Sequence, residues 1–511
     1  MAETSVLAGL SSVNASGLKK WSVRDVMDGT IDETIENEGK LGRERYTRLM
    51  DYGSYVYTDE RQAEEHKIGM SELFLNSVHD KVRRDRVRDL RCTIYRVPPE
   101  IRSTLPEAYT PMAVCIGPFF YSERNGTKLR QMQDYKWTCM RKLMPNDEYS
   151  GWLKVGLVLM KILEPTIRAS YSDEIKMSSD DLAEMLLLDG CFILHLLLKH
   201  SEGAEISRTD PTDEDGMQVI GRIWIWNLVR YDLLLLENQI PFVVIIHLYI
   251  LLINNNYGPE DFNGAGSHLV ACGRRLFSSI HPSGADASFS AECDPIVCHL
   301  LHLFYLSIPQ YAQPTRYRYR SALLEEAPHG IPSAEELQDA GVKLKKRKNA
   351  ISFLDIKFRK GVMEIPPLEV HDYSNSLFRN LIAFEQCHPG TNFQITVYAA
   401  FMDCLLNTPK DSRLLHLSGI INNRMTADQD AAHFFRRICS QVHYSSDRSY
   451  LRDLCADVNK YKLSRRHKWR AALVRDYFSS PWVIISFLAA IFLLLLTAGQ
   501  TFYTIYPFYH K

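Results

Sequence analysis

The residues best suited to bind a metal ion are two cysteines and two histidines near position 300. Cys293 is followed by Cys298, His299 and His302, and on a helix Cys298 and His302 would share one face because they are four residues apart. Zinc accepts thiolate and imidazole ligands. The leucines between these residues favour a packed helix with a buried thiol and hydrogen-bonded imidazoles, and no second Cys/His pair is placed nearby. We therefore assign no metal ligands.

Two acidic residues that lie among apolar residues are candidates for a catalytic carboxylate. Glu237-Asn238-Gln239 separates two strongly apolar segments, and Glu385 follows Asn380 in a second such region. A buried polar group without a partner costs roughly 1–3 kcal/mol, so these side chains must be hydrogen-bonded where helices meet or must line a site. We favour a hydrogen-bonded junction, and an enzyme with a site around Glu237 or Glu385 is the alternative.

Linear motifs of the common enzyme classes do not occur in the sequence. There is no GxxxxGK[ST], no GxGxxG after a predicted strand, no GxSxG and no HExxH. The glycine-rich run Gly264–His268 follows no predicted strand, and we expect it in a loop. The sequence thus predicts a protein that is not an enzyme, with no catalytic, cofactor-binding or metal-binding residues, no cofactor and no small-molecule substrate.

Charge is balanced over the chain, with 60 Lys and Arg against 61 Asp and Glu. This balance excludes a global polyelectrolyte partner, so we expect no nucleic acid. The basic run Lys343–Lys348 is similar to a nuclear-import or phosphate-binding run. Close to a membrane anchor, a solvated loop or a contact with anionic lipid fits this run better.

The C-terminal region is an uninterrupted apolar stretch, without a formal charge from Phe478 to Tyr509. A bilayer core of ~30 Å needs roughly 20 apolar residues in a helix, and residues 481–506 supply them. Pro481 suits the first helical position, and Trp482 and Tyr503 resemble the aromatic residues of membrane interfaces. We predict a transmembrane helix over 481–506 and a short tail over 507–511. A buried core helix is the alternative, although core helices seldom run this long without a charge.

Several features predict where the body lies. Arg465, Arg466 and three further cations precede the span, whereas only Lys511 follows it, and positive charge stays on the cytoplasmic side. The first residues lack a basic region and a long apolar core, as a signal peptide would require. The 11 cysteines are scattered without CxxC, as in a reducing compartment. We expect a single-pass, tail-anchored protein of the plasma membrane with a cytosolic body, and the sequons at Asn14 and Asn125 would matter only in a lumenal body.

The rest of the chain predicts a mainly α protein: a large helical body with a small β-hairpin and one C-terminal transmembrane helix. We expect a polar lead over 1–65, the body over 70–475 and a linker near 311–330. Alternating apolar residues on both sides of Gly361 predict the hairpin, within residues 351–366. The apolar segment 240–253 has only 14 residues, a length that fits a buried core helix better than a second span.

Ordered sequence blocks connect this chain to a known family. They are Arg96-Val97-Pro98, Tyr109-Thr110-Pro111, Ile116-Gly117-Pro118-Phe119, Leu129–Gln133 with Lys136, Asp189–Leu194, Asp232–Phe242, Ile331–Leu337, Ala340-Gly341-Val342, Arg379–Gln386 and Pro481-Trp482. In these blocks the chain resembles the plant family catalogued as domain of unknown function 247 (DUF247, also UPF0481), from about residue 70 to the end.

The resemblance implies a single-span membrane protein, and the biochemical activity of the family is not established. In grasses, members of the family are implicated as pollen-side determinants of self-incompatibility. The resemblance therefore implies a plant recognition or signalling component that acts through protein–protein contacts. Its expected partners are a protein at a membrane and the lipid bilayer around the C-terminal helix.

Overall fold

The structure is a computed structural model that describes residues 92–124, 126, 129–144, 149–201, 223–253, 259–283, 297–309, 311, 330–425, 431–444, 449–463 and 481–509. The predicted lead over 1–65, nearly all of the predicted linker and the sequons at Asn14 and Asn125 lie outside these residues. The described part is mostly helical with two small sheets, so the prediction of a mainly α protein is confirmed.

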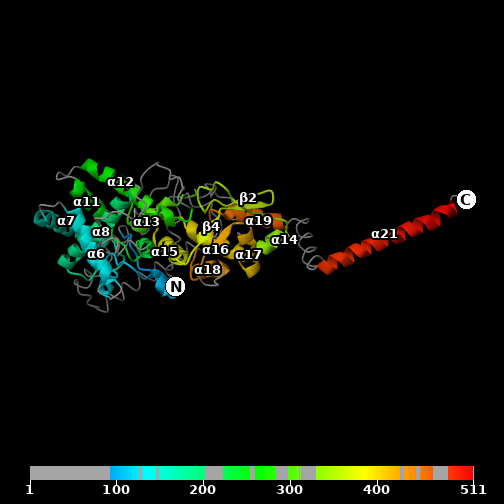
Figure 1. Ribbon diagram of the computed structural model, residues 1–511, viewed down its shortest axis with the longest axis horizontal. Coiled ribbons are helices and arrows are strands. Elements are labelled where there is room, and N and C mark those ends of the chain that lie inside the picture. The colour runs from blue at the N-terminus through cyan, green and yellow to red at the C-terminus, as the bar shows by residue number, and fades with distance from the viewer. Residues whose placement is uncertain are drawn as a thin grey trace, which may run out of the picture. The chain divides into compact units, whose positions relative to one another are not determined.

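One central helix organises the first half of the body (Figure 1). Helix α8 (Ser179–Ser201) packs against α6 (Arg130–Leu143), α7 (Tyr149–Ala169), α11 (Phe242–Ile253) and α12 (Pro259–Phe277). Along α8 nearly every apolar side chain is buried. A helix that is apolar on all sides needs neighbours on all sides, and the four surrounding helices supply them.

The apolar segment 240–253 is the buried helix α11 rather than a second membrane span, as predicted. The prediction of a loop over Gly264–His268 is wrong, because these residues lie within α12. Ala265, Leu269 and Cys272 recur at helical spacing and are buried on the side of α12 that packs against α8 and α11. This spacing decides the conformation despite the two glycines.

An extended segment with three single-turn helices runs along the first half of the body. It comprises a bridge between Ile94 and Tyr171, then α5 (Pro99–Arg102), η2 (Pro106–Tyr109) and, beyond Phe120, η3 (Tyr121–Glu123). The later elements of this half are α10 (Ile223–Asp232), η4 (Ser278–Ile280) and α13 (Leu300–Ser307).

The second half of the body combines helices with both sheets. Its helices are α14 (Ala334–Asp339), α15 (Ser374–Cys387), α16 (Gln394–Leu405), α17 (Pro409–Leu417), α18 (Ala431–Ile438) and α19 (Arg452–Leu463). Two of these helices have side-chain caps. The Ser333 side chain accepts the backbone N–H of Glu336 at the start of α14, and Thr408 and Asp411 form a reciprocal capping box on α17.

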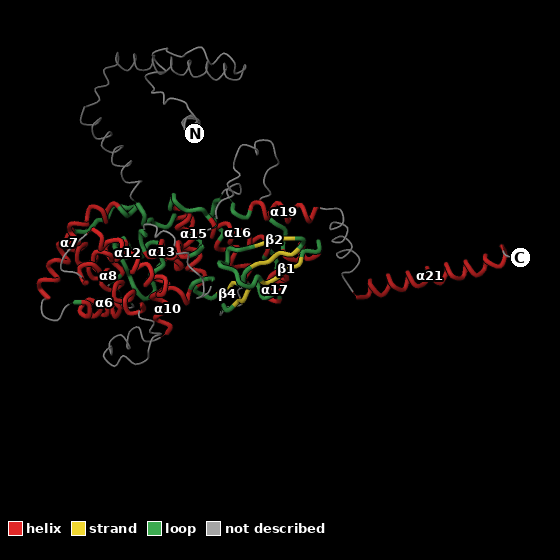
Figure 2. Tube along the Cα trace, turned by 90° about the horizontal axis from the view of Figure 1, so that it is seen from above, coloured by secondary structure: helices red, strands yellow, loops and turns green. Residues whose placement is uncertain are grey.

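The larger sheet contains the predicted hairpin (Figure 2). Strands β2 (Lys357–Arg359) and β3 (Val362–Ile365) pair antiparallel, and β1 (Lys343–Lys346) adds to β3 in parallel. The hairpin is confirmed, although its first strand begins later than the alternation suggested. The basic run beginning at Lys343 is a strand, not a loop, because Leu344 packs inward between exposed lysines. A second sheet joins β4 (Leu368–Val370) and β5 (Ile421–Asn423) in parallel.

The C-terminal helix α21 spans Pro481–Tyr509. Its stretch Ile485–Phe502 has a mean hydropathy of 2.0, and none of this stretch is buried against the protein. Among the described helices, this one alone is long and apolar enough to cross a membrane. The helix therefore satisfies the length and composition expected of the predicted span.

Candidate functional site

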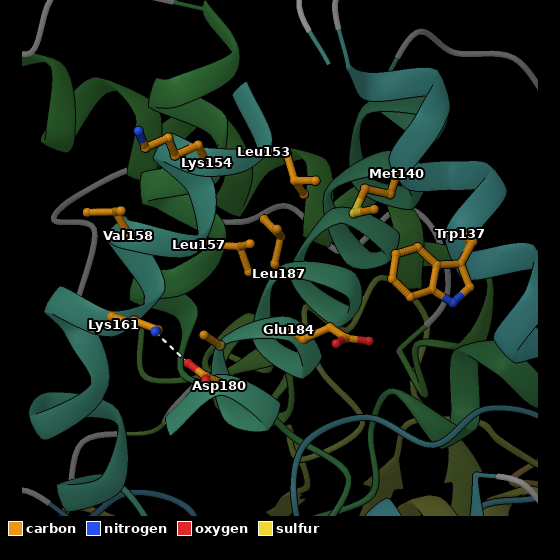
Figure 3. Close-up of a pocket in the computed structure, with 11 residues that line it drawn as sticks. Trp137, Met140, Leu153, Lys154, Leu157, Val158, Lys161, Asp180, Glu184 and Leu187 are labelled. Carbon is orange, nitrogen blue, oxygen red and sulfur yellow. Dashed lines mark ion pairs between the residues drawn. The ribbon is translucent and has the colours of Figure 1, made fainter. Parts of the chain in front are cut away.

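A groove between three helices is the candidate functional site (Figure 3). It has a volume of about 410 Å³ and lies where α6, α7 and the start of α8 meet. Its lining is mostly apolar, with charged side chains among it: Trp137, Met140, Leu153, Lys154, Leu157, Val158, Lys161, Asp180, Ala183, Glu184 and Leu187.

Helix α7 turns apolar side chains outward beside this groove. Val155, Val158 and Ile162 are 50%, 49% and 69% exposed. Their spacing of three and then four residues places them on one face of the helix. The opposite face of α7, which includes Met160 and Ile167, is fully buried. The helix is thus apolar on two faces, although only one of them packs within the described part of the chain.

The edges of the groove carry opposite charges. Lys154 and Lys161 come from α7, whereas Asp180 and Glu184 come from α8. Lys161 Nζ lies 2.5 Å from Asp180 Oδ1, so one ion pair closes one end of the groove (Figure 3). Both side chains are at least half exposed, and an exposed pair of this kind contributes little to stability. It can therefore rearrange when a ligand binds.

Trp137 forms the far wall of the groove on α6 and is 38% exposed. A large aromatic side chain at the edge of an apolar floor is typical of residues that dominate binding energy at interfaces. The lining residues include no cysteine, serine, threonine or histidine. The arrangement is therefore suited to hold a row of apolar side chains.

The predicted polar island lies away from this groove. Glu237 is 2% exposed, and its carboxylate accepts the Val97 backbone N–H at 2.7 Å. Arg96 Nη1 lies 2.9 Å from one carboxylate oxygen and Arg102 Nη2 lies 2.5 Å from the other. Glu237 therefore fastens the extended segment to the body, and it does not point into open space.

Its two neighbours make the same kind of connection. Asn238 accepts the Ile116 N–H at 2.7 Å and donates to Val114 O at 2.9 Å. Gln239 donates to the Leu233 carbonyl at 2.8 Å. Since all three residues of the island bond to backbone or to charged partners, the predicted hydrogen-bonded junction is what the structure contains.

Glu385 is also enclosed, with no exposed surface. Its carboxylate accepts the N–H groups of Ile395 and Thr396 at 3.0 and 2.8 Å and the Thr396 hydroxyl at 2.6 Å, at the start of α16. Burial raises the pKa of Glu385 to about 7, against the effect of these donors. Asn380, one turn earlier, accepts the Leu236 N–H and donates to Ala108 O, both at 2.9 Å.

A buried charge cluster was not predicted from the sequence. Asp189 on α8 contacts Arg124 and Lys136, and all three side chains are at most 4% exposed. Asp189 also accepts the Gly117 N–H at 2.8 Å. Burial alone would raise the pKa of Asp189, but the two cations hold it below its usual range, and burial lowers the pKa of Lys136 to about 8. The available signal was a single acid within the apolar sequence of α8.

The candidate metal ligands do not share a helix face. Helix α13 begins at Leu300 with His299 as its N-cap, so Cys298 precedes the helix. The Cys298 N–H donates to His302 Nδ1 at 3.2 Å, and the pKa of His302 falls to about 4 because the ring is buried. Cys293 lies outside the described residues. Within the described residues, no group of three or more His, Cys, Asp or Glu side chains is arranged to hold a metal ion.

Comparisons with known proteins place these features in a family. The model of DUF247, described as a plant protein of unknown function, matches residues 94–496. A UPF0481 protein of Arabidopsis thaliana is 30% identical over 430 residues, which cover 80% of this chain and 85% of that protein. A putative UPF0481 protein of the same plant is 22% identical over 532 residues, which cover 86% of this chain and 96% of that protein. No solved structure matches the chain significantly.

Proposed function

Because this chain belongs to the plant family DUF247, whose function is unknown, we propose its function from the groove and α21: it is a single-pass membrane protein that recognises a protein partner. The binding role and the membrane anchoring have separate support. The family membership supports plant cell recognition or signalling as the setting, of which pollen-side self-incompatibility is one form.

The exposure of α21 supports the anchoring. Apolar side chains from Ile485 to Phe502 have no contact that buries them within the described body. Leu493, Leu494 and Leu495 are 62%, 70% and 66% exposed. Lipid solvates such a surface, whereas water penalises it in proportion to its area. The cations that precede the span support a cytosolic body, and the plasma membrane is the membrane we propose.

The occupant that we propose for the groove is an amphipathic helix of the partner protein. Its apolar face would cover the floor formed by Leu157 and Leu187 and the exposed row that includes Val158. The charged edges add a constraint, since acidic side chains of the partner would face Lys154 and basic ones would face Glu184. The proposal is a binding role because the groove lining offers an apolar floor and no nucleophile.

The observation that carries this proposal is the exposed apolar row of α7 beside Trp137. Exposed apolar surface next to an aromatic side chain and rimmed by charges marks interaction sites. Neither Glu237 nor Glu385 lines the groove. The two buried carboxylates and the groove are therefore separate features of the molecule.

Photo-crosslinking tests the proposed partner. The full chain is expressed in plant cells with a benzophenone side chain at Val158, and the crosslinked peptide is identified by mass spectrometry. We expect a segment of another protein whose apolar residues recur at helical spacing between acidic and basic flanks. A probe at Leu417, which is 73% exposed on α17, serves as the matched control and should not capture this segment.

Substitution in the groove completes the test. Val158→Glu with Ile162→Glu should lower the crosslink from Trp137 about tenfold or more, because each places a charge on the apolar row. Leu417→Glu should leave the crosslink unchanged. A crosslink to a second copy of this chain or to its own N-terminal residues would contradict the proposed partner, and so would equal capture by the Val158 and Leu417 probes.

A further inference from the structure

The outward side of the three-stranded sheet carries four exposed cations. Lys343 and Lys345 lie on β1, and Lys357 and Arg359 lie on β2. Through β3, Lys343 aligns with Arg359, and Lys345 aligns with Lys357 two residues along. Residues two apart in a strand point to the same face, so all four share one face. We call these four residues the basic sheet face.

The other side of the same sheet is apolar and packed. Leu344, Met363 and Phe358 form the row between the two charged rows, and Met363 has no exposed surface. On the outward side the acid in these rows is Glu364, which lies 3.6 Å from Arg347. Within the described part of the chain, no carboxylate forms an ion pair with the basic sheet face. This face therefore carries a net positive charge that is open to solvent.

The sheet is joined to the helix that leads to the anchor. The Phe358 ring packs edge-on against the Tyr461 ring of α19, with 5.7 Å between centroids, and α19 lies beside β2 (Figure 2). A side chain at Gly361 would collide with Tyr461, so the hairpin turn also fits closely against this helix. Helix α19 and the sheet therefore move as one piece.

The connection from α19 to α21 is short. It consists of the 17 residues 464–480, between Leu463 and Pro481. At a maximum of roughly 3.3–3.6 Å per residue, this connection keeps the sheet within about 60 Å of the membrane surface when α21 spans the bilayer. A tether of this length raises the local concentration of the surface for any weak contact. The segment itself contains five cations: Arg465, Arg466, Lys468, Arg470 and Arg475.

We propose that the basic sheet face binds the anionic phospholipid headgroups of the leaflet that α21 enters. The inference rests on the proposed anchoring by α21. Each Lys or Arg close to an anionic leaflet strengthens association roughly fivefold, so four cations on one flat face make a stable contact once the anchor holds the body nearby. The contact would fix the orientation of the body on the membrane. The tether favours lipid over nucleic acid, the other polyanion that such a face would attract.

Lysine labelling in nanodiscs tests this proposal with the full chain. An amine-reactive reagent is applied to the protein in phosphatidylcholine nanodiscs and in nanodiscs that also contain phosphatidylserine. We expect labelling of Lys343, Lys345 and Lys357 to fall about fivefold or more in the anionic nanodiscs. Lys410, whose side chain is 79% exposed, should label equally in both. At ~1 M salt the difference should disappear, because the Debye length falls to about 3 Å.

Charge reversal supplies the matched comparison. Lys345→Glu with Lys357→Glu should abolish the protection of Lys343, whereas Lys154→Glu with Lys176→Glu makes the same charge change elsewhere and should preserve it. Equal labelling of Lys343 in both kinds of nanodisc would overturn the proposal and leave the anchoring intact. Protection by added RNA in neutral nanodiscs, without protection by phosphatidylserine, would overturn it in favour of nucleic acid. A chain that alkaline carbonate washes from the nanodiscs would overturn the anchoring and this proposal with it.

Discussion

The ammonium nitrogen of Lys136 lies 2.7 Å from carboxylate oxygen Oδ1 of Asp189, and both side chains are almost fully buried. Arg124 approaches the other oxygen of the same carboxylate. Two cations thus share one buried anion at the position where the extended segment meets α8. Their desolvation is offset by this pairing and by backbone partners, among them the Gly117 N–H and carbonyl.

Removing the shared anion is expected to destabilise the body strongly. Asp189→Asn leaves Arg124 and Lys136 buried without a counter-charge, which should lower the free energy of unfolding by about 3–5 kcal/mol. Lys136→Met should cost less, because Asp189 keeps Arg124. Urea unfolding of the full chain in detergent measures both. Asp180→Asn, at a side chain 83% exposed, is the control, and an equal loss in that variant would contradict the assigned role of Asp189.

The buried imidazole of His302 should make the body sensitive to acid. Its pKa is about 4 in the folded state and about 6.5 in an unfolded chain. Between these values the unfolded state binds the proton first, so stability falls as pH decreases from about 6.5 to about 4, by up to ~1.4 kcal/mol per pH unit.

His302→Asn isolates this contribution, since Asn can still accept the Cys298 N–H but does not titrate. The difference between the parent and variant stabilities should depend on pH across that window. Glu385, whose pKa is raised to about 7, contributes with the opposite sign, but equally in both proteins. Identical pH profiles of unfolding would show that His302 is not buried and neutral in the folded state.

Two glycines should respond in opposite ways to alanine. Gly117 has a φ of +75°, and an added Cβ would lie 2.3 Å from the Gln239 carbonyl oxygen. Gly117→Ala should therefore destabilise the body by about 2 kcal/mol or more, through strain and displacement of the backbone. Gly264 lies in the interior of α12 with nothing within 4 Å of an added Cβ. Gly264→Ala should stabilise the body by roughly 0.5–1 kcal/mol. Thermal unfolding distinguishes the two, and a loss in both variants would contradict the assignment of Gly264 to an open helix face.

The orientation of the anchor can be measured in cells. With α21 in the plasma membrane and the body in the cytosol, protease added to intact protoplasts should leave the body uncut, whereas permeabilised cells should lose it. Asn125 should carry no glycan. Truncation before Pro481 should release the chain into the soluble fraction, because no other described helix is long and apolar enough to span a bilayer. Glycan at Asn125 would reverse the assigned orientation.

Most helices could be predicted because their signals are local. Helix α6 extends over nearly the residues that its apolar spacing indicated, and the cap at Ser333 was readable from Glu336 three residues later. The role of Glu237 as part of a junction followed from the cost of burying an unpaired polar group. Its partners, Arg96 and Arg102, could not be identified, because they are about 140 residues earlier in the chain and pair with it only in the folded body.

The groove was beyond local reasoning. Val158 and Ile162 have the spacing of core residues, and a helix pattern cannot show that one of its apolar faces has no neighbour. The same limit applies to the basic sheet face, since the run at Lys343 shows its charge but neither its strand conformation nor its alignment with Lys357.

The sequence by itself determined the apolar helix at the C-terminus, the mainly helical class and the family, because length, charge, spacing and ordered motifs are properties of the chain alone. Only the tertiary structure decided that Asp189 is shared by two cations, that Glu237 and Glu385 are enclosed, and that α7 keeps an apolar face open beside Trp137. Burial depends on which distant segments pack together, and packing is established only when the whole body has folded.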